Sequence, residues 1–370
     1  MRGFPFCSLN NILDKVAREE SLSRSEILYL LGLDEDGETE RLFEIARRLR
    51  ARYFGDKIFL YGFLYFSTWC RNHCTFCYYR ASNKFCKRYR RTEDEILEAA
   101  IHLAESGVHL LDLTMGEDPL YFDEEDGFTP LLALVRKIKR ETGLPTMISF
   151  GVIPNDVLKK LPDAGADWYA CYQETHDRAL FRRLRPNQDY DARLQIKQEA
   201  FRLGLLVEEG ILHGVGESLT DIAHSIDVMK KMGAHQVRIM NFVPQRGTPM
   251  SHFPPPDRKR ELVTIAVLRL LFPHRLIPAS LDVYGIAGLR EKLWAGANVV
   301  TSLIPPSFEL SGVAQSTLDI REGYRTVKAV TPILNELGLK GAGVGNYLSW
   351  VEGQKNALMK GFHFDRGCLS

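Results

Sequence analysis

Features that would direct the chain to a membrane, to nucleic acid or out of the cell are missing from the sequence. No apolar run reaches the roughly 18 residues that a membrane span needs, and Arg2 is not followed by the apolar core of a secretion signal. Neither sign of charge dominates, because 48 Lys and Arg stand against 47 Asp and Glu. We therefore expect a cytoplasmic globular protein whose main partner is neither a nucleic acid nor a membrane.

Cysteine is also scarce, and its distribution argues against a disulfide framework. Three of the seven cysteines crowd into eight positions, and the others are scattered. Closely spaced thiols in a reducing compartment more often bind metal or carry out redox chemistry than form disulfides. The seven are Cys7, Cys70, Cys74, Cys77, Cys86, Cys171 and Cys368.

What the sequence does contain is a repeated alternation of short apolar runs and helix-length amphipathic segments. Such repeated βα units predict an α/β fold, a (βα)8 TIM-type barrel. An open doubly wound sheet is the alternative, but no Gly-rich dinucleotide turn follows the first run. The eight strand candidates are 58–66, 109–115, 145–150, 168–172, 206–213, 236–242, 275–281 and 298–304. The helix candidates between and after them are 93–105, 130–142, 189–203, 219–232, 258–271 and a segment from 310 onward.

Two flanking regions complete the predicted organisation. Residues 1–53 form an N-terminal helical lead-in, in which Ser23 and Glu26 have the spacing of a capping box, and we expect it to cover the barrel. The barrel itself is assigned to 54–313. Residues 314–370 are expected to pack on the barrel as a helix near 330–337 followed by a Gly-rich tail.

Polar residues recur where the predicted strands end. In a (βα)8 barrel the chemistry gathers at the C-terminal ends of the strands. A single residue of this kind is more often structural, but buried charges at many strand ends are costly unless they are paired or bound to a ligand. The polar residues at the ends of the predicted strands are Asp112, Thr114, Ser149, Glu174, His213, Arg238, Asn241, Ser280, Asp282, Thr301 and Ser302.

The first predicted strand leads into a cysteine motif, C-x3-C-x2-C, formed by Cys70, Cys74 and Cys77. Three thiolates on one short loop can ligate three irons of a cubane cluster and leave the fourth iron open. A structural zinc site is the alternative, with His73 as a fourth ligand. Zinc sites usually have four ligands in paired spacings, and His73 lies between two of the cysteines, where it cannot easily reach the same metal.

A cysteine motif of this kind after a first barrel strand resembles that of the radical S-adenosylmethionine (SAM) superfamily. The resemblance implies a [4Fe-4S] cluster held by Cys70, Cys74 and Cys77, with SAM on the open iron. Reductive cleavage of SAM then yields a 5′-deoxyadenosyl radical, while the protein positions the reactants and excludes water.

Further segments are similar to the clade that contains biotin synthase and the hydrogenase maturases. Gly116-Glu117-Asp118-Pro119 resembles its motif for the cofactor amino group, and Glu174 with Arg193 resembles its acid and arginine for the ribose and carboxylate. Ser149 is assigned to the same cofactor site, and 210–217 resembles the strand that supports adenine. A surface ion pair is the alternative for Glu174 and Arg193.

The most extensive resemblance, over 53–313, is to the methylornithine synthases of pyrrolysine biosynthesis. It implies that Asp112, Arg238, Ser280 and Asp282 bind the amino-acid substrate. One arginine facing two aspartates suits L-lysine, which carries one carboxylate and two ammonium groups. A structural ion pair of Arg238 with one aspartate is the alternative. The implied reaction is isomerisation to (3R)-3-methyl-D-ornithine by hydrogen abstraction, Cα–Cβ fragmentation and recombination.

Other interpretations remain open at this point. Another radical SAM enzyme of the same clade would give a different product, and a non-catalytic iron–sulfur or zinc module would not cleave SAM. A basic run after the cysteine motif could dock an acidic reductant such as flavodoxin or ferredoxin, although such runs are usually solvated loops. It consists of Lys84, Lys87, Arg88, Arg90 and Arg91.

Overall fold

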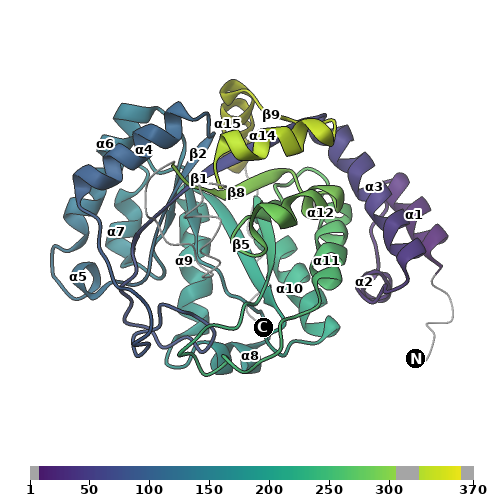
Figure 1. Ribbon diagram of the computed structural model, residues 1–370, viewed down its shortest axis with the longest axis horizontal. Helices are drawn as coiled ribbons and strands as arrows, with labels where there is room; N and C mark the ends of the chain where they lie inside the picture. Colours follow the sequence, from purple (N-terminus) through teal and green to yellow (C-terminus); the bar gives the residue numbers. More distant parts are fainter. Residues whose placement is uncertain (1–7, 306–324, 360–370) are drawn as a thin grey trace.

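In a computed structural model that describes residues 8–305 and 325–359, eight parallel strands form a nearly closed barrel (Figure 1). The strand order is β6-β5-β4-β3-β2-β1-β8-β7, and β6 and β7 meet through an isolated bridge between Gln236 and Leu276. The strands are β1 (Lys57–Ser67), β2 (Leu110–Met115), β3 (Thr146–Ser149), β4 (Trp168–Ala170), β5 (Leu206–His213), β6 (Gln236–Asn241), β7 (Pro278–Ser280) and β8 (Val299–Leu303). Each lies within or around one of the predicted runs, so the (βα)8 fold class is confirmed.

Helices cover the outside of the barrel, and several begin at the caps that the sequence provides. Capping boxes start α4 at Thr92 and α10 at Ser218, and Gly143 and Gly233 end α6 and α10 in the left-handed conformation. The helices of the barrel are α4 (Glu93–Glu105), α5 (Pro119–Phe122), α6 (Phe128–Thr142), α7 (Asn155–Lys160), α8 (Arg178–Leu184), α9 (Tyr190–Arg202), α10 (Leu219–Met232), α11 (Arg258–Leu271), the 3-10 helix η1 (Gly285–Gly288) and α12 (Leu289–Trp294). The predicted segment from 310 onward begins outside the described residues. No helix among those described is long and apolar enough to cross a membrane.

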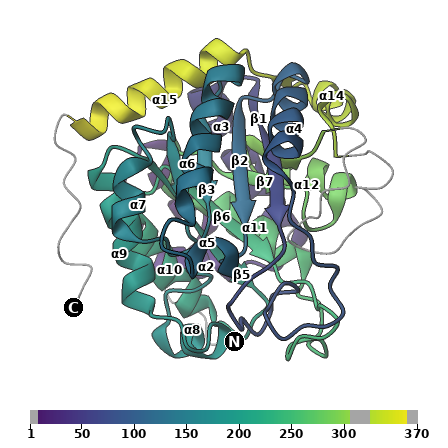
Figure 2. The ribbon, with the colours of Figure 1, turned by 90° about the vertical axis from the view of Figure 1, so that its left-hand side faces the viewer.

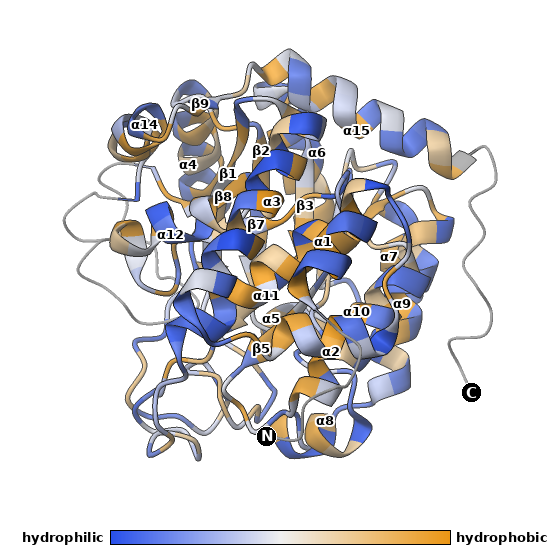
Figure 3. Cartoon of the chain, turned by 90° about the vertical axis from the view of Figure 1, so that its right-hand side faces the viewer, coloured by the Kyte–Doolittle hydropathy of each residue, from blue (hydrophilic) through white to orange (hydrophobic). Residues whose placement is uncertain are grey.

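The N-terminal lead-in is helical as predicted, but its expected position over the barrel is wrong. It consists of α1 (Leu9–Ala17), α2 (Arg24–Leu31) and α3 (Asp36–Phe54), and the Ser23–Glu26 capping box is present at α2. Helix α2 packs on α10 and α11, and α3 packs on α11, so the lead-in lies on the flank of the barrel (Figures 1 and 3). The apolar residues of the lead-in therefore bury the outer face of these barrel helices.

The C-terminal region contains more helix than the sequence pattern predicts. The expected helix is present as α14 (Val327–Glu336), but the Gly-rich stretch then gives a short strand, β9 (Lys340–Gly341), and a second helix, α15 (Val344–Met359). Helix α15 lies across the N-terminal ends of the barrel strands (Figure 2). Local glycines disfavour a helix, yet burial of Tyr347 and Val351 against the barrel stabilises this one.

Aromatic side chains close the barrel beneath α15. The Tyr347 ring packs against Phe59 and Tyr61, and its hydroxyl lies 2.8 Å from that of Tyr61. Trp350 of α15 stacks on Trp168, with ring centroids 5.9 Å apart. Apolar packing thus fills the N-terminal end of the barrel, and polar residues lie at the C-terminal ends of the strands.

Candidate functional site

A cavity occupies the C-terminal end of the barrel. The parallel register of the strands brings predicted polar residues to this end, because Thr114 pairs with Ser149 and His213 with Asn241. The polar lining of the cavity includes Cys77, Asp112, Thr114, Ser149, Glu174, Arg238, Asn241, Gln245, Asp282, Thr301 and Ser302.

Asp112 lies on the wall formed by β2 and β3. Thr114 donates to its Oδ1 at 3.0 Å and Ser149 to the same atom at 2.8 Å, while Oδ2 accepts no hydrogen bond from the described residues. Burial and the nearby charge of Glu208 raise the pKa of Asp112 to about 7, against the opposing effect of the two hydroxyls and Arg238. Ser149, assigned to the cofactor from the sequence, is therefore in contact with a residue assigned to the substrate.

Arg238 on β6 forms a buried ion pair with a residue that the sequence analysis did not single out. Its Nε lies 2.7 Å from Oε1 of Glu208 on β5, and Glu208 is fully buried. Burial opposes the charge of Arg238, but Glu208, Tyr172 and Asp112 outweigh it and raise the pKa of the guanidinium. Because Glu208 takes the Nε–H and Nη1 makes only a 3.7 Å contact with the Met240 sulfur, the terminal Nη groups can fork onto a carboxylate in the cavity.

Asp282 follows β7 and is already paired with a cation. Its Oδ1 lies 2.9 Å from Nη1 of Arg325, and its Oδ2 accepts from Ser302 at 2.6 Å and from Ser280 at 3.3 Å. Ser280 itself does not line the cavity, and its hydroxyl accepts from the Asp282 backbone N–H at 3.2 Å. Asp112, Arg238 and Asp282 line the same cavity, and Glu208 beside Arg238 and Arg325 beside Asp282 add two charges that the sequence pattern does not predict.

The cysteine loop forms part of the cavity wall through Phe76 and Cys77. Gly116 lets this loop pack closely on the end of β2, because a Cβ there would lie 2.4 Å from the Trp69 carbonyl oxygen and 2.7 Å from Cys70 Cβ. Burial raises the pKa of Cys70 to about 11, so metal binding must displace a proton from this thiol. The five described cysteines are all free thiols.

Mononuclear zinc gains no support from the arrangement of the side chains. Within 8–305 and 325–359, no three His, Cys, Asp or Glu side chains converge as ligands of one metal ion do. A cubane takes one thiolate at each of three irons and needs no such convergence. The fit of the loop to a cluster rests on its three cysteine thiols, the ligand type that such clusters take.

The two acidic residues of the Gly116–Pro119 segment make different contacts. Glu117 Oε1 accepts from the Val152 backbone N–H at 3.1 Å, its Oε2 accepts from Arg71, and it lines a second hollow beside the cysteine loop. Asp118 is fully buried and binds both Arg90 Nε and Nη2, at 2.7 and 2.8 Å. Asp118 thus joins the Gly116–Pro119 segment to the loop that follows the cysteines.

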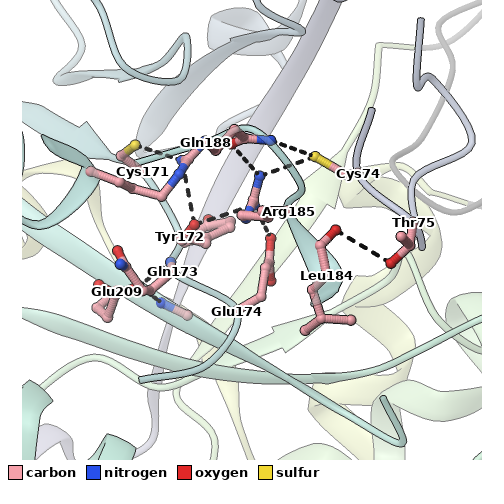
Figure 4. A network of polar contacts seen from close by, with 12 residues as sticks. Cys74, Thr75, Cys171, Tyr172, Gln173, Glu174, Leu184, Arg185, Gln188 and Glu209 are labelled. Atoms are coloured by element: carbon pink, nitrogen blue, oxygen red, sulfur yellow. Dashed lines mark hydrogen bonds and ion pairs between the residues drawn. The ribbon is translucent and has the colours of Figure 1, made fainter. Parts of the chain in front are cut away.

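Glu174 and Arg193 are both buried, so the alternative of a surface ion pair between them is wrong. Glu174 Oε1 lies 2.6 Å from Nη2 of Arg185 (Figure 4). Arg193 instead bonds to the Cys171 sulfur and to Gln188 Oε1. Burial raises the pKa of Glu174, and the two arginines oppose that shift. Its backbone is left-handed, with φ of 67°, a strained conformation of the kind that clusters at functional sites.

The arginines of the basic run after the cysteines are held by contacts within the chain. Arg88 donates to the carbonyl oxygens of Thr68, Tyr79 and Arg80, and Arg90 to Asp118. Lys84, Lys87 and Arg90 are exposed. Because Arg88 and Arg90 already bind other parts of the chain, the expectation that the whole run docks a reductant is weakened.

Comparison with known proteins agrees with this geometry. The profile of the Radical SAM superfamily matches residues 64–229. The 3-methylornithine synthase of Methanosarcina barkeri is 44% identical over 329 residues, covering 89% of this chain and 93% of the relative. The [FeFe] hydrogenase maturase subunit HydE of Thermotoga maritima is 32% identical and covers 80% and 84%.

Among solved structures, the crystal structure of methylornithine synthase (PylB) superposes with a TM-score of 0.87 at 42% identity. The match covers 93% of this chain and all of that one. Sequence identity, coverage and fold thus agree. The chain belongs to the radical SAM superfamily, within the family of the 3-methylornithine synthases.

Proposed function

We propose that the protein is a radical SAM mutase that isomerises L-lysine to (3R)-3-methyl-D-ornithine. The observation that carries the proposal is a single barrel-end cavity that joins the cysteine loop, Glu174, and the charged residues Asp112, Arg238 and Asp282. It holds cationic and anionic groups on different strands, as recognition of a zwitterionic diamino acid requires.

Substrate binding is proposed to rest on two charged walls. Arg238, oriented by Glu208, takes the lysine carboxylate with its Nη groups. Asp112 takes an ammonium group with Oδ2, because Thr114 and Ser149 already occupy Oδ1. Asp282 contributes through a network with Ser302, Ser280 and Arg325, which fixes its carboxylate before substrate enters.

The cofactors are assigned to a second set of residues, of which Cys77, Ser149 and Glu174 line the cavity. Cys70, Cys74 and Cys77 are proposed to hold the [4Fe-4S] cluster with one iron open, and Gly116, Glu117, Ser149, Glu174 and Arg193 to surround SAM. When bound, the cluster and SAM supply the radical that removes hydrogen from lysine. The apolar and charged walls of the cavity are proposed to keep the fragments of the broken Cα–Cβ bond together until they recombine.

Anaerobic reconstitution tests the proposal directly. The purified protein is loaded with iron and sulfide, supplied with SAM, dithionite and L-lysine, and the amino acids are derivatised and separated against authentic 3-methylornithine. We expect an isomer of unchanged mass that co-elutes with the standard. Cleavage of SAM without this isomer would favour another reaction of the clade, and absence of cleavage would reject radical chemistry altogether.

The reductant, the compartment and the domain limits are further parts of the proposal. Exposed Lys84 and Lys87 beside the cysteine loop suit an acidic donor such as flavodoxin or ferredoxin. Because free thiols and reducing equivalents are needed, we assign the enzyme to the cytoplasm. We retain 1–53, 54–313 and 314–370 as the lead-in, barrel and C-terminal units, although the second boundary falls outside the described residues.

A further inference from the structure

Two side chains that no site assignment above uses are directed at one cysteine of the loop. Arg185 Nη1 lies 3.3 Å from the Cys74 sulfur, and Gln188 Nε2 lies 3.0 Å from the same atom (Figure 4). Both come from the connection between α8 and α9, and Cys74 and Arg185 are buried. The sulfur of a presumed cluster ligand therefore accepts two side-chain hydrogen bonds.

The orientation of Gln188 is set by its other contacts. Its Oε1 accepts from Arg193 Nη2 at 3.1 Å and from Arg185 Nη1 at 3.3 Å. An amide oxygen between two guanidinium groups leaves the NH2 end to face the sulfur, because the reverse orientation would place donors against donors. Gln188 is thus fixed as a donor to Cys74.

The same connection is anchored to the cysteine loop by the backbone. The Thr75 N–H donates to the Leu184 carbonyl oxygen at 2.8 Å, one residue before Arg185. On its far side, Arg185 holds Glu174 at 2.6 Å, and this carboxylate offsets part of the guanidinium charge. The hydrogen bonds to the Cys74 sulfur therefore affect that sulfur more than the net charge of Arg185 does.

We infer that Arg185 and Gln188 raise the reduction potential of the cluster by donating hydrogen bonds to the Cys74 sulfur. The inference rests on the proposed function, since it takes Cys74 as a cluster ligand. Gaining one electron makes the cluster and its thiolates more negative, and donors at a ligand sulfur stabilise the reduced form more than the oxidised form. These two are positioning residues in this sense, not catalytic ones.

The test is a redox titration of the reconstituted holoenzyme without SAM or lysine, followed by EPR of the reduced cluster. In Gln188→Leu, which removes one donor, we expect the ratio of oxidised to reduced cluster at fixed potential to rise about tenfold, which corresponds to about 59 mV for one electron. Gln188→Glu, which replaces the donor by an acceptor, should raise the ratio of oxidised to reduced cluster further. Arg185→Met should shift it in the same direction.

Arg182→Met is the matched control, because Arg182 is an exposed cation on α8. Its titration should match that of the wild type. Ratios within threefold of wild type in both Gln188 variants, at equal iron and sulfide content, would overturn the inference. Loss of the cluster from all three test variants would also overturn it, since the residues would then hold the loop and not tune it. A wild-type protein that assembles no cluster would instead defeat the proposed function.

Discussion

The two ends of the barrel bury very different side chains. At the N-terminal end, Tyr61, Trp168 and Tyr347 fill the space with rings, and helix α15 covers them (Figure 2). At the C-terminal end, Asp112 and Arg238 are almost as deeply buried but surround a cavity. Apolar burial stabilises the first end, whereas burial penalises the charges at the second end, a cost that the partners of Arg238 outweigh and those of Asp112 do not. The comparison indicates that one end maintains the fold and the other is kept for a ligand.

Cysteine substitution should give the largest effect, confined to the C-terminal end. Cys77→Ala is expected to abolish cluster assembly and lower the rate of SAM cleavage by at least about a thousandfold, roughly 4 kcal/mol. Iron analysis measures cluster assembly, and quantification of 5′-deoxyadenosine measures SAM cleavage. Cys86→Ala is the control, because Cys86 is buried outside the motif and should retain the cluster. Full iron content in Cys77→Ala would contradict the assigned ligand set.

Removing part of the aromatic packing should destabilise the N-terminal end of the barrel. Tyr347→Ala removes a fully buried ring and its contact with the Tyr61 hydroxyl, so we expect the free energy of unfolding to fall by about 3 to 5 kcal/mol. Denaturant titration measures this, and the KM for lysine should not change at a temperature where the variant is folded. Leu348→Ala, at an exposed position on the same helix, should change stability by less than about 0.5 kcal/mol.

Arg238→Lys sharpens the comparison at the cavity. Lysine keeps the positive charge beside Glu208 but cannot fork onto a carboxylate, so kcat/KM for L-lysine should fall roughly a hundredfold, about 2.7 kcal/mol. SAM cleavage in the absence of lysine should be unaffected. Arg246→Lys, at an exposed position on the loop after β6, serves as the control. An unchanged kcat/KM would remove Arg238 from the substrate site.

The smallest predicted effect is the pH dependence of substrate binding. With the pKa of Asp112 near 7, its carboxylate is mostly protonated at pH 6 and mostly ionised at pH 8. Since an ammonium group is bound by the ionised form, kcat/KM for lysine should rise about tenfold over this interval. Asp112→Asn should give a lower and flat profile. A wild-type profile that falls with pH would show that the protonated form binds.

Local sequence patterns predicted most of the barrel because each βα unit carries its own signal. Residues 206–213, 93–105 and 219–232 match β5, α4 and α10 at both ends, since apolar periodicity and capping residues coincide there. Helix α15 was missed because its stability comes from burial of Tyr347 against distant strands, while its own sequence includes Gly345 and Gly353. The flank position of α1 to α3 was missed for the same reason, since periodicity shows an apolar face but not its partner.

At the candidate site, polar residues at strand ends could be identified one by one, but their partners could not. Glu208 was visible as a charge inside an apolar run, and its pairing with Arg238 depends on the register of β5 with β6. Arg185 follows a short helix in an arginine-rich segment and shows no local sign that it contacts Cys74 and Glu174. Ion pairs between distant elements depend on geometry that no sequence window contains.

The sequence by itself determined the repeated βα pattern, the cysteine motif and the set of charged residues at the strand ends, because these follow from spacing and side-chain chemistry within short segments. Tertiary structure alone decided which end α15 closes, which cation faces which carboxylate, and which donors reach the Cys74 sulfur. These depend on through-space distances of a few ångströms between elements far apart in the chain, where desolvation and hydrogen bonding set the energies.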